Sequence, residues 1–376
     1  MLNDGRSPLK VRPMRPPRFL SLLLLICGLA SPAMAAEKHY LYLSSPDGAQ
    51  AEGHSGNGIL IFDIDDGHKF LRRIDIPMFQ EGMRGMTANA ARHCIYYSTT
   101  NHGLGCFDLE SEKVLWEKHY DVGCDRTSIT PDGSKLYVPT GWWYLEPSGG
   151  FLVVDPATGE IVKRLSAGTA AHNSITTLDG QFALLGTTTA LTVFRTKDDS
   201  VAKAISPVGE FGVFPFTVDS RNRYAYVCLG KHVGFDVVDL QSGEVPHRVL
   251  AGDTPIEHRT HGAALTPDES ELWISDQVGK QLFVFDATQM PPKQKAQIPL
   301  SMGGHGWVSF SLDGRYAWCH TPDVIDAHTK KVITTLKDES GKPVASSKFV
   351  EVDFNDGKVT RVGCEFGLGR AQVAKQ

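Results

Sequence analysis

The fold is decided by the stretch at residues 257–268, EHRTHGAALTPD, which is followed after three residues by the apolar run 272–276, LWISD. A short alternating strand, a Pro-Asp turn and a second strand are typical of the start of one β-propeller blade. Variants of this phrase recur along the chain, and this copy carries two histidines, His258 and His261, at its entrance. The stretch therefore indicates a repeat protein in which polar residues mark one point of the repeat.

The second strand of the phrase can be aligned in six copies, which begin at positions 95, 136, 183, 225, 272 and 316. Their spacing of roughly 41 to 47 residues is that of four-stranded propeller blades. Each copy continues with a third strand that ends in an acid-rich turn, such as 282–286, LFVFD, and then with a fourth strand. The alternation with period two, bounded by Gly, Asp and Pro, predicts strands throughout.

The chain ends explain how the array closes. Residues 40–74 supply three strands that lack an inner strand, and the missing strand is predicted at 348–354, KFVEVDF. Pairing it with the N-terminal strands closes a ring and removes exposed edges. We therefore expect an all-β, seven-bladed propeller of four-stranded blades, formed as a single domain by residues 36–376.

The phrase at 130–140, TPDGSKLYVPT, closely resembles the repeat phrase of bacterial YVTN-type β-propellers, and the resemblance covers nearly all of the chain after residue 36. It implies a seven-bladed fold similar to the lactonase-like propellers and to the β chain of quinoprotein amine dehydrogenases. It implies little about function, because propellers carry many unrelated activities.

The first residues read as a targeting segment. Arg12, Arg15 and Arg18 precede an apolar run at 19–29, and 33–35, AMA, is a cleavage pattern, so residues 1–35 are predicted to be a secretory signal peptide. The apolar run is too short to span a membrane. We expect a periplasmic or secreted chain with no membrane span. Without residues 1–35 the formal net charge changes from −5 to −9, which disfavours a nucleic-acid partner.

Cysteine spacing excludes several cofactor motifs. Six cysteines follow residue 36, and none forms C-x-x-C or C-x-x-C-H, so no haem-attachment motif is present; P-loop and dinucleotide fingerprints are absent as well. The sequence therefore predicts no haem and no nucleotide cofactor. In an exported protein, Cys94 and Cys106 on neighbouring strands are the first pair to test for a disulfide, whereas Cys228 and Cys319 in apolar runs are expected to be buried thiols.

Polar residues recur where the inner strand of each blade begins, at the mouth of the central channel. The position eleven residues before each aligned strand holds, in chain order, Arg84, Asp125, His172, Phe214, His261 and His305. The next position holds Gly85, Arg126, Asn173, Pro215, Gly262 and Gly306, and the seventh blade is expected to contribute near residues 346–348. One strand-end histidine is usually a solvated side chain, and a water-filled channel also explains polar residues. Convergence of five such residues nevertheless predicts a site.

Each residue type suggests a role at that site. Three neutral imidazoles, from His172, His261 and His305, suit a divalent transition metal. Candidates for proton transfer are His261, His258 and Asp125. Candidates for holding an anionic ligand or stacking on it are Arg84, Arg126, Asn173, Trp142, Trp143 and Trp307.

Two functional interpretations remain open. The first is an exported enzyme with an axial site for a small-molecule or glycan ligand, of lactonase-like hydrolase or lyase type. The second is a non-catalytic binding or scaffold propeller for a protein, glycan or redox partner.

Overall fold

A computed structural model of the chain describes residues 1, 37–50, 52–140, 149–168, 170–210, 215–363 and the backbone of 372–373. The chain divides into two units, residues 1–35 and residues 36–376, and all the described strands belong to the second unit. The predicted signal peptide lies, apart from Met1, outside the described residues. Within the described part, no helix is long and apolar enough to cross a membrane.

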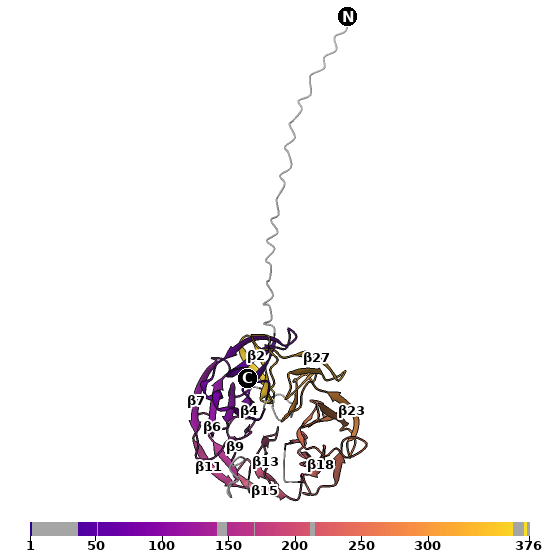
Figure 1. The fold of residues 1–376 in the computed structure, drawn as a ribbon. Helices are drawn as coiled ribbons and strands as arrows, with labels where there is room; N and C mark the ends of the chain where they lie inside the picture. Colours follow the sequence, from indigo (N-terminus) through magenta and orange to yellow (C-terminus); the bar gives the residue numbers. More distant parts are fainter. Residues whose placement is uncertain are drawn as a thin grey trace. The chain divides into compact units, whose positions relative to one another are not determined.

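The described strands form seven antiparallel blades of four strands around a central axis, which confirms the predicted seven-bladed propeller (Figure 1). The inner strands are β4 (Met83–Asn89), β8 (Ser128–Ile129), β12 (Ser174–Thr176), β16 (Phe216–Val218), β20 (Thr260–Leu265), β24 (Val308–Phe310) and β28 (Phe349–Asn355). The second strands are β5 (Cys94–Thr99), β9 (Leu136–Thr140), β13 (Phe182–Gly186), β17 (Tyr224–Cys228), β21 (Glu271–Asp276), β25 (Tyr316–Cys319) and β1 (Lys38–Ser45).

The outer half of each blade follows the same order. The third strands are β6 (Gly103–Asp108), β10 (Gly150–Val154), β14 (Leu191–Arg195), β18 (Gly234–Asp239), β22 (Gln281–Asp286), β26 (Asp323–Asp326) and β2 (Gly58–Asp63). The fourth strands are β7 (Lys113–His119), β11 (Ile161–Ser166), β15 (Ser200–Ile205), β19 (His247–Leu250), β23 (Lys293–Pro299), β27 (Lys331–Thr335) and β3 (Lys69–Ile74). A single 3-10 helix, η1 (Pro77–Glu81), precedes β4 among the described residues.

The ring closes as the sequence predicts, because β28 from the C-terminal part pairs with β1 from the N-terminal part, with Leu41 opposite Glu351. The structure adds a feature that the repeat pattern does not contain. β29 (Lys358–Val362) and β30 (Gln372–Val373) extend this sheet on the far side of β28, so its order is β3-β2-β1-β28-β29-β30.

Burial falls from the axis outward. Every residue of inner strand β4 is buried, whereas most residues of the fourth strand of that blade, β7, are exposed. Apolar side chains from neighbouring blades fill the space between the sheets; Phe235 and Phe285, for example, contact each other from adjacent blades. A polar residue on an inner strand is therefore buried, and needs partners that a surface residue does not.

The two ends of the ring differ in what they bring together. We call the end where the inner strands begin the axial mouth; the loops that lead into the inner strands and those between second and third strands surround it. We call the end where β28 turns into β29 the basal end. The five described cysteines are free, buried thiols, so Cys228 and Cys319 are as expected, and Cys94 and Cys106 form no disulfide.

Candidate functional site

Two predicted site residues stand at irregularities of the inner strands. The pairing of β4 with β5 shifts register between Met83 and Gly85, which places Arg84 at the irregularity, and the pairing of β20 with β21 shifts between Thr260 and Ala263, which places His261 there. An extra residue at such a point turns its side chain away from the regular alternation of the strand. The sequence folds this way because Gly262 follows His261: a Cβ there would lie 2.2 Å from the carbonyl oxygen of Gly306 on the next blade.

Asp125 joins two of the predicted residues. Arg84 Nη2 donates to Asp125 Oδ2 over 3.0 Å, and His172 Nδ1 lies 2.7 Å from the same oxygen. All three side chains are buried. Burial alone would raise the pKa of Asp125, but Arg84 and His172 outweigh it and hold that pKa below its usual value. A histidine that donates Nδ1–H to a carboxylate carries its lone pair on Nε2, which is the arrangement of a proton acceptor or a metal ligand.

The three predicted histidines follow one another across the axis. The ring centroids of His172 and His261 are 6.1 Å apart, and those of His261 and His305 are 4.9 Å apart. His261 Nδ1 has no hydrogen-bond partner among the described residues. Gln277 Nε2 lies 2.8 Å from His305 Nε2, and because an amide N–H only donates, this ring nitrogen of His305 accepts.

The environment keeps these histidines neutral. Burial lowers the pKa of His172, with Asp125 opposing the shift, and burial together with His305 and His172 lowers the pKa of His261 well below its usual value. Burial and the neighbouring Lys348 lower the pKa of His305 to about 4. Near neutral pH these rings therefore offer one donor and one acceptor each rather than a positive charge.

A second buried polar network lies beside the histidines. Lys348 Nζ lies 3.2 Å from both carboxylate oxygens of Asp47, and Ser347 Oγ donates to Asp47 Oδ2 over 2.7 Å. Arg126 Nη2 donates to Ser347 Oγ over 3.1 Å, and its guanidinium carbon lies 3.9 Å from the ring centroid of Trp307. The seventh blade thus contributes Ser347 and Lys348, within the range that the sequence predicts.

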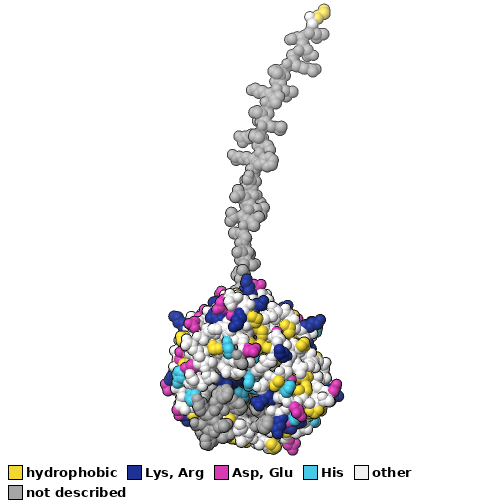
Figure 2. Space-filling model, in the orientation of Figure 1, with side chains coloured by type: hydrophobic (Ala, Val, Ile, Leu, Met, Phe, Trp, Pro, Cys, Tyr) yellow, Lys and Arg dark blue, Asp and Glu magenta, His cyan; other side chains and the backbone are white. Residues whose placement is uncertain are grey.

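A cavity of about 770 Å³ opens next to His305. Its lining residues come from loops of the axial mouth and are Gly230, Lys231, His232, Glu257, His258, Arg259, Gln277, Val278 and His305. His258 Nδ1 lies 3.3 Å from the buried carboxylate of Asp276, so the loop histidine is held on the cavity wall. Histidine and Lys or Arg side chains lie near the middle of the face shown in Figure 2. The volume is sufficient for a small organic ligand.

The structure brings most of the predicted site residues together. Arg84, Asp125, Arg126, His172, His261, His305 and Trp307 belong to the connected set described above. Asn173 is fully buried beside Arg126, and its side-chain amide has no hydrogen-bond partner among the described residues. The face of Trp307 is covered by Arg126 rather than open to the cavity. Trp142, Trp143 and Phe214 lie outside the described residues.

Three further residues of the axial mouth were not predicted as part of the site. Asp47 follows β1, Gln50 Nε2 donates to the backbone oxygen of His305 over 2.5 Å, and His320 follows β25. His320 is fully buried, burial lowers its pKa to about 4, and neither ring nitrogen has a partner among the described residues. Second strands end at the axial mouth, so the last residue of the aligned run 316–320 was the signal that could have identified His320.

The spacing of donor atoms bears on the predicted metal site at His172, His261 and His305. Among the described residues, one group of three ligand-type side chains has donor atoms that all lie within 4.8 Å of one another, and it consists of Glu37, His39 and Asp353 at the basal end. The three axial histidines do not form such a group within the part of the chain that the structure describes. A metal shared by all three would require their rings to move closer together.

Comparisons with known proteins support the fold. No protein-family model matches the sequence, and no curated protein does. Among solved structures, the chain is similar to Kuenenia stuttgartiensis hydrazine synthase, with a TM-score of 0.57, 18% identity, and coverage of 66% of this chain and 77% of that chain. It is also similar to dihydro-heme d1 dehydrogenase NirN in complex with DHE, with a TM-score of 0.55, 14% identity, and coverage of 85% of this chain and 75% of that chain. At these identities the likeness shows the fold alone.

Proposed function

We propose that this chain is an exported β-propeller that binds a small, carboxylate-bearing ligand at the axial mouth. The observation that carries the proposal is the position of His305, whose ring both lines the cavity and contacts His261 of the buried cluster. A ligand in the cavity would meet a neutral imidazole backed by a chain of polar groups. Convergent polar groups at the wall of a cavity are the usual arrangement of a ligand site.

The charges favour an anion. Lys231 and Arg259 outnumber Glu257 among the residues that line the cavity. Behind them, three buried cations, Arg84, Arg126 and Lys348, face the two carboxylates Asp47 and Asp125. Two further carboxylates with little exposure lie behind the cavity wall, Asp276 beside His258 and Glu210 beside His232, and they balance the remaining cations. The attraction for a ligand carboxylate therefore comes from Lys231 and Arg259 on the wall itself, and the carboxylate could accept hydrogen bonds from ammonium, guanidinium and imidazole groups.

The same site is compatible with catalysis. The Asp125–His172 pair orients a neutral imidazole, and His258 is held by Asp276, so a proton acceptor is available both within the cluster and on the cavity wall. Lactone hydrolysis or eliminative cleavage would need such a base, in line with the resemblance to YVTN-type and lactonase-like propellers. A non-catalytic ligand-binding propeller would use the same residues for recognition alone.

Calorimetric titration with a set of small mono-, di- and tricarboxylates tests the proposal. We expect at least one to bind the full chain and to bind about tenfold or more weakly to His305→Ala and Arg259→Ala, since each variant removes one charge-assisted or imidazole hydrogen bond. His119→Ala is the matched control, because His119 is an exposed histidine on β7 that pairs with Glu81. If no carboxylate binds, or if the two variants bind like the control, the proposal is wrong.

An iron tetrapyrrole is a second candidate, because the NirN structure was solved in complex with DHE and that protein is named as a dihydro-heme d1 dehydrogenase. The expectation of no haem rested on the missing C-x-x-C-H motif, which bears only on covalent attachment, and it is left without support. Lys231 and Arg259 could hold the carboxylates of such a ligand, and His305 could hold iron once Gln277, whose amide donates to His305 Nε2, turns away from that nitrogen. A shifted Soret band on adding hemin, lost in His305→Ala and kept in His119→Ala, would favour this candidate; an unshifted band would exclude it.

A further inference from the structure

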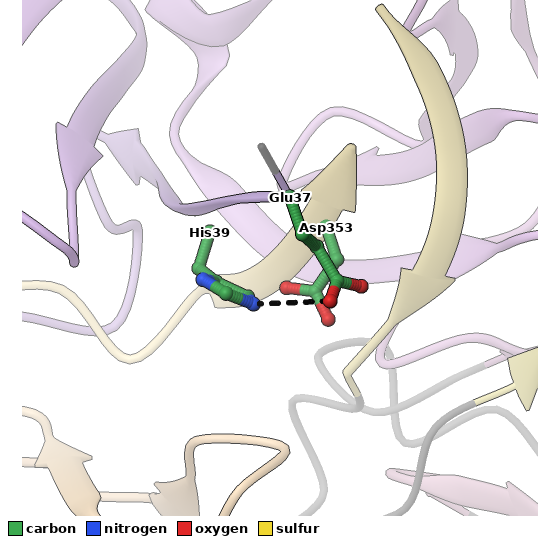
Figure 3. Close-up of side chains that lie close together, drawn as sticks. All are labelled: Glu37, His39 and Asp353. Atoms are coloured by element: carbon green, nitrogen blue, oxygen red, sulfur yellow. Dashed lines mark ion pairs between the residues drawn. The ribbon is translucent and has the colours of Figure 1, made fainter. Parts of the chain in front are cut away.

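A second cluster of polar side chains lies at the basal end, where the two ends of the propeller sequence are paired. Glu37 immediately precedes β1, His39 lies near the start of β1, and Asp353 comes from β28; Figure 3 shows the three side chains pointing toward one another. We propose that Glu37, His39 and Asp353 form a binding site for a divalent transition metal that joins the N-terminal and C-terminal strands of the closing blade. This site is independent of the axial mouth and of the function proposed for it.

Strand register explains why these residues meet. His39 of β1 stands directly opposite Asp353 of β28. Glu37 precedes His39 by two residues, and side chains two residues apart in an extended segment lie on the same side. One donor atom from each residue lies within 4.8 Å of the others, so small side-chain adjustments bring them to metal-bonding distance.

His39 is oriented as a metal-binding histidine. Its Nδ1 lies 2.8 Å from Asp65 Oδ1, and its backbone N–H donates to Asp65 Oδ2 over 3.1 Å. Donation of Nδ1–H to this carboxylate leaves the lone pair on Nε2, which faces Glu37 at 3.9 Å. Histidine ligands commonly donate their other ring N–H to a carboxylate in this way, which fixes the tautomer and increases the basicity of the ligand nitrogen.

The third residue of the cluster, Asp353, lies in a buried position. Its side chain is fully buried, beside the carboxyl group of Glu351. Arg361 Nε lies 2.8 Å from Oδ2 as an ion pair, but Arg361 is one-third exposed and its N–H is not directed at the carboxylate. Glu351, two residues earlier on the same strand, adds another buried acid. Two buried acids beside one partly exposed cation are costly to keep ionised, and a bound metal ion would stabilise them.

The donor set selects the class of metal. One imidazole nitrogen and two carboxylates suit Zn²⁺ or a similar first-row divalent ion, whereas Ca²⁺ prefers six or more oxygen ligands. The site is open enough for an ion to enter, because Glu37 is 46% and His39 28% exposed. A metal held here would cross-link β1 and β28, the two strands whose pairing closes the ring.

Zinc titration of the full, untagged chain after EDTA treatment tests the site. We expect the chain to bind one more Zn²⁺ than His39→Ala, with Ca²⁺ unable to compete, and we expect Zn²⁺ to raise the melting temperature of the wild type more than that of His39→Ala. Asp65→Asn should weaken zinc binding about 10- to 100-fold, as expected for loss of the carboxylate that orients a ligand histidine. His119→Ala is the control and should bind zinc like the wild type.

The comparison of stoichiometries separates this site from the axial mouth. Zinc bound by the axial histidines would remain in His39→Ala and disappear in His305→Ala. Asp353→Asn should also lose the additional zinc. If this buried variant fails to fold, Glu37→Gln tests the same cluster at an exposed position and should lose the additional zinc as well. Equal zinc stoichiometry in wild type, His39→Ala and Glu37→Gln would overturn the proposal.

Discussion

The axial mouth and the basal end are built from the same strands but collect polar residues in different ways. At the axial mouth, inner strands of several blades begin side by side, so Arg84, Asp125, His172 and His261 come from four separate copies of the repeat. At the basal end, the Glu37–His39–Asp353 cluster belongs to one blade and depends on the pairing of the two chain ends. Position within the repeat thus decides whether polar residues form a ring around the axis or a local cluster.

The electrostatics of the two ends also differ. At the axial mouth, burial lowers the pKa of the histidines, and the buried acids Asp47 and Asp125 have lowered pKa values because cations outweigh the effect of burial. At the basal end, burial would lower the pKa of His39, but Asp65 and the neighbouring acids outweigh it and raise that pKa. These directions agree with the anionic ligand proposed for the axial mouth and with the metal ion proposed for the basal end.

The largest expected difference between the ends is in stability. Lys348→Met should destabilise the protein by about 3–5 kcal/mol, because Lys348 is 1% exposed and its loss leaves the buried Asp47 without this counter-charge. Arg361→Met at the basal end should cost less, about 1–3 kcal/mol, because Arg361 is 34% exposed and water can partly replace it beside the buried Asp353. Urea unfolding at pH 7 measures both. Equal losses of unfolding free energy in the two variants would show that the ion pair at the axial mouth is not more strongly stabilising than the one at the basal end.

The next prediction concerns pH. The pKa of His320 is about 4 in the folded protein and about 6.5 in the unfolded chain. Between these two pH values the unfolded chain binds more protons at His320 than the folded protein does. The free energy of unfolding is therefore highest above pH 6.5 and falls as pH drops toward 4. The loss is up to about 1.4 kcal/mol per pH unit for one histidine. His320→Gln should flatten the decline in unfolding free energy over this window by that amount.

His39→Gln in EDTA is the matched variant for the basal end. The raised pKa of His39 places its effect above pH 6.5, where stability is lost as pH rises. The His39→Gln substitution should leave the decline in unfolding free energy between pH 6.5 and 4 unchanged. If His39→Gln flattens that decline and His320→Gln does not, the contrast drawn between the two ends is wrong.

The smallest expected effect is that of the stacked guanidinium. Arg126→Lys should cost about 0.5–2 kcal/mol, because a lysine cannot keep both the stacking on Trp307 and the hydrogen bond to Ser347. Arg223→Lys, where the guanidinium lies 4.8 Å from the Tyr224 ring centroid at an exposed position, is the control and should cost less. Thermal unfolding followed by tryptophan fluorescence distinguishes the two; a larger cost at Arg223 would contradict the role given to Arg126.

Much of the fold was predictable because the strand and turn signals are local and repeated. The same repetition located Arg84, Asp125, His172, His261 and His305, since one register carries all five around the axis. Gly262 and Gly306 follow two of these histidines, and neither position has room for a side chain: a Cβ on Gly306 would lie 1.8 Å from His320 Nδ1.

The remaining residues could not be placed by the repeat. Asp47 and Gln50 lie in a loop after β1, outside the aligned copies, and their contacts with Lys348 and His305 exist only once the ring has closed. The register of His39 opposite Asp353 joins residues more than 300 positions apart, and no local pattern fixes it. The shifts in strand pairing that reorient Arg84 and His261 have no marker in the sequence other than a following glycine.

The most direct test of the central claim is a crystal structure of the chain soaked with the tightest-binding carboxylate from the titration set. We predict ligand density in the cavity of about 770 Å³, with a carboxylate oxygen within hydrogen-bond distance of His305 or Arg259. Density confined to another cavity, such as the one of about 640 Å³ lined in part by Lys203, Arg221 and Arg223, would contradict the claim that the axial mouth is the binding site.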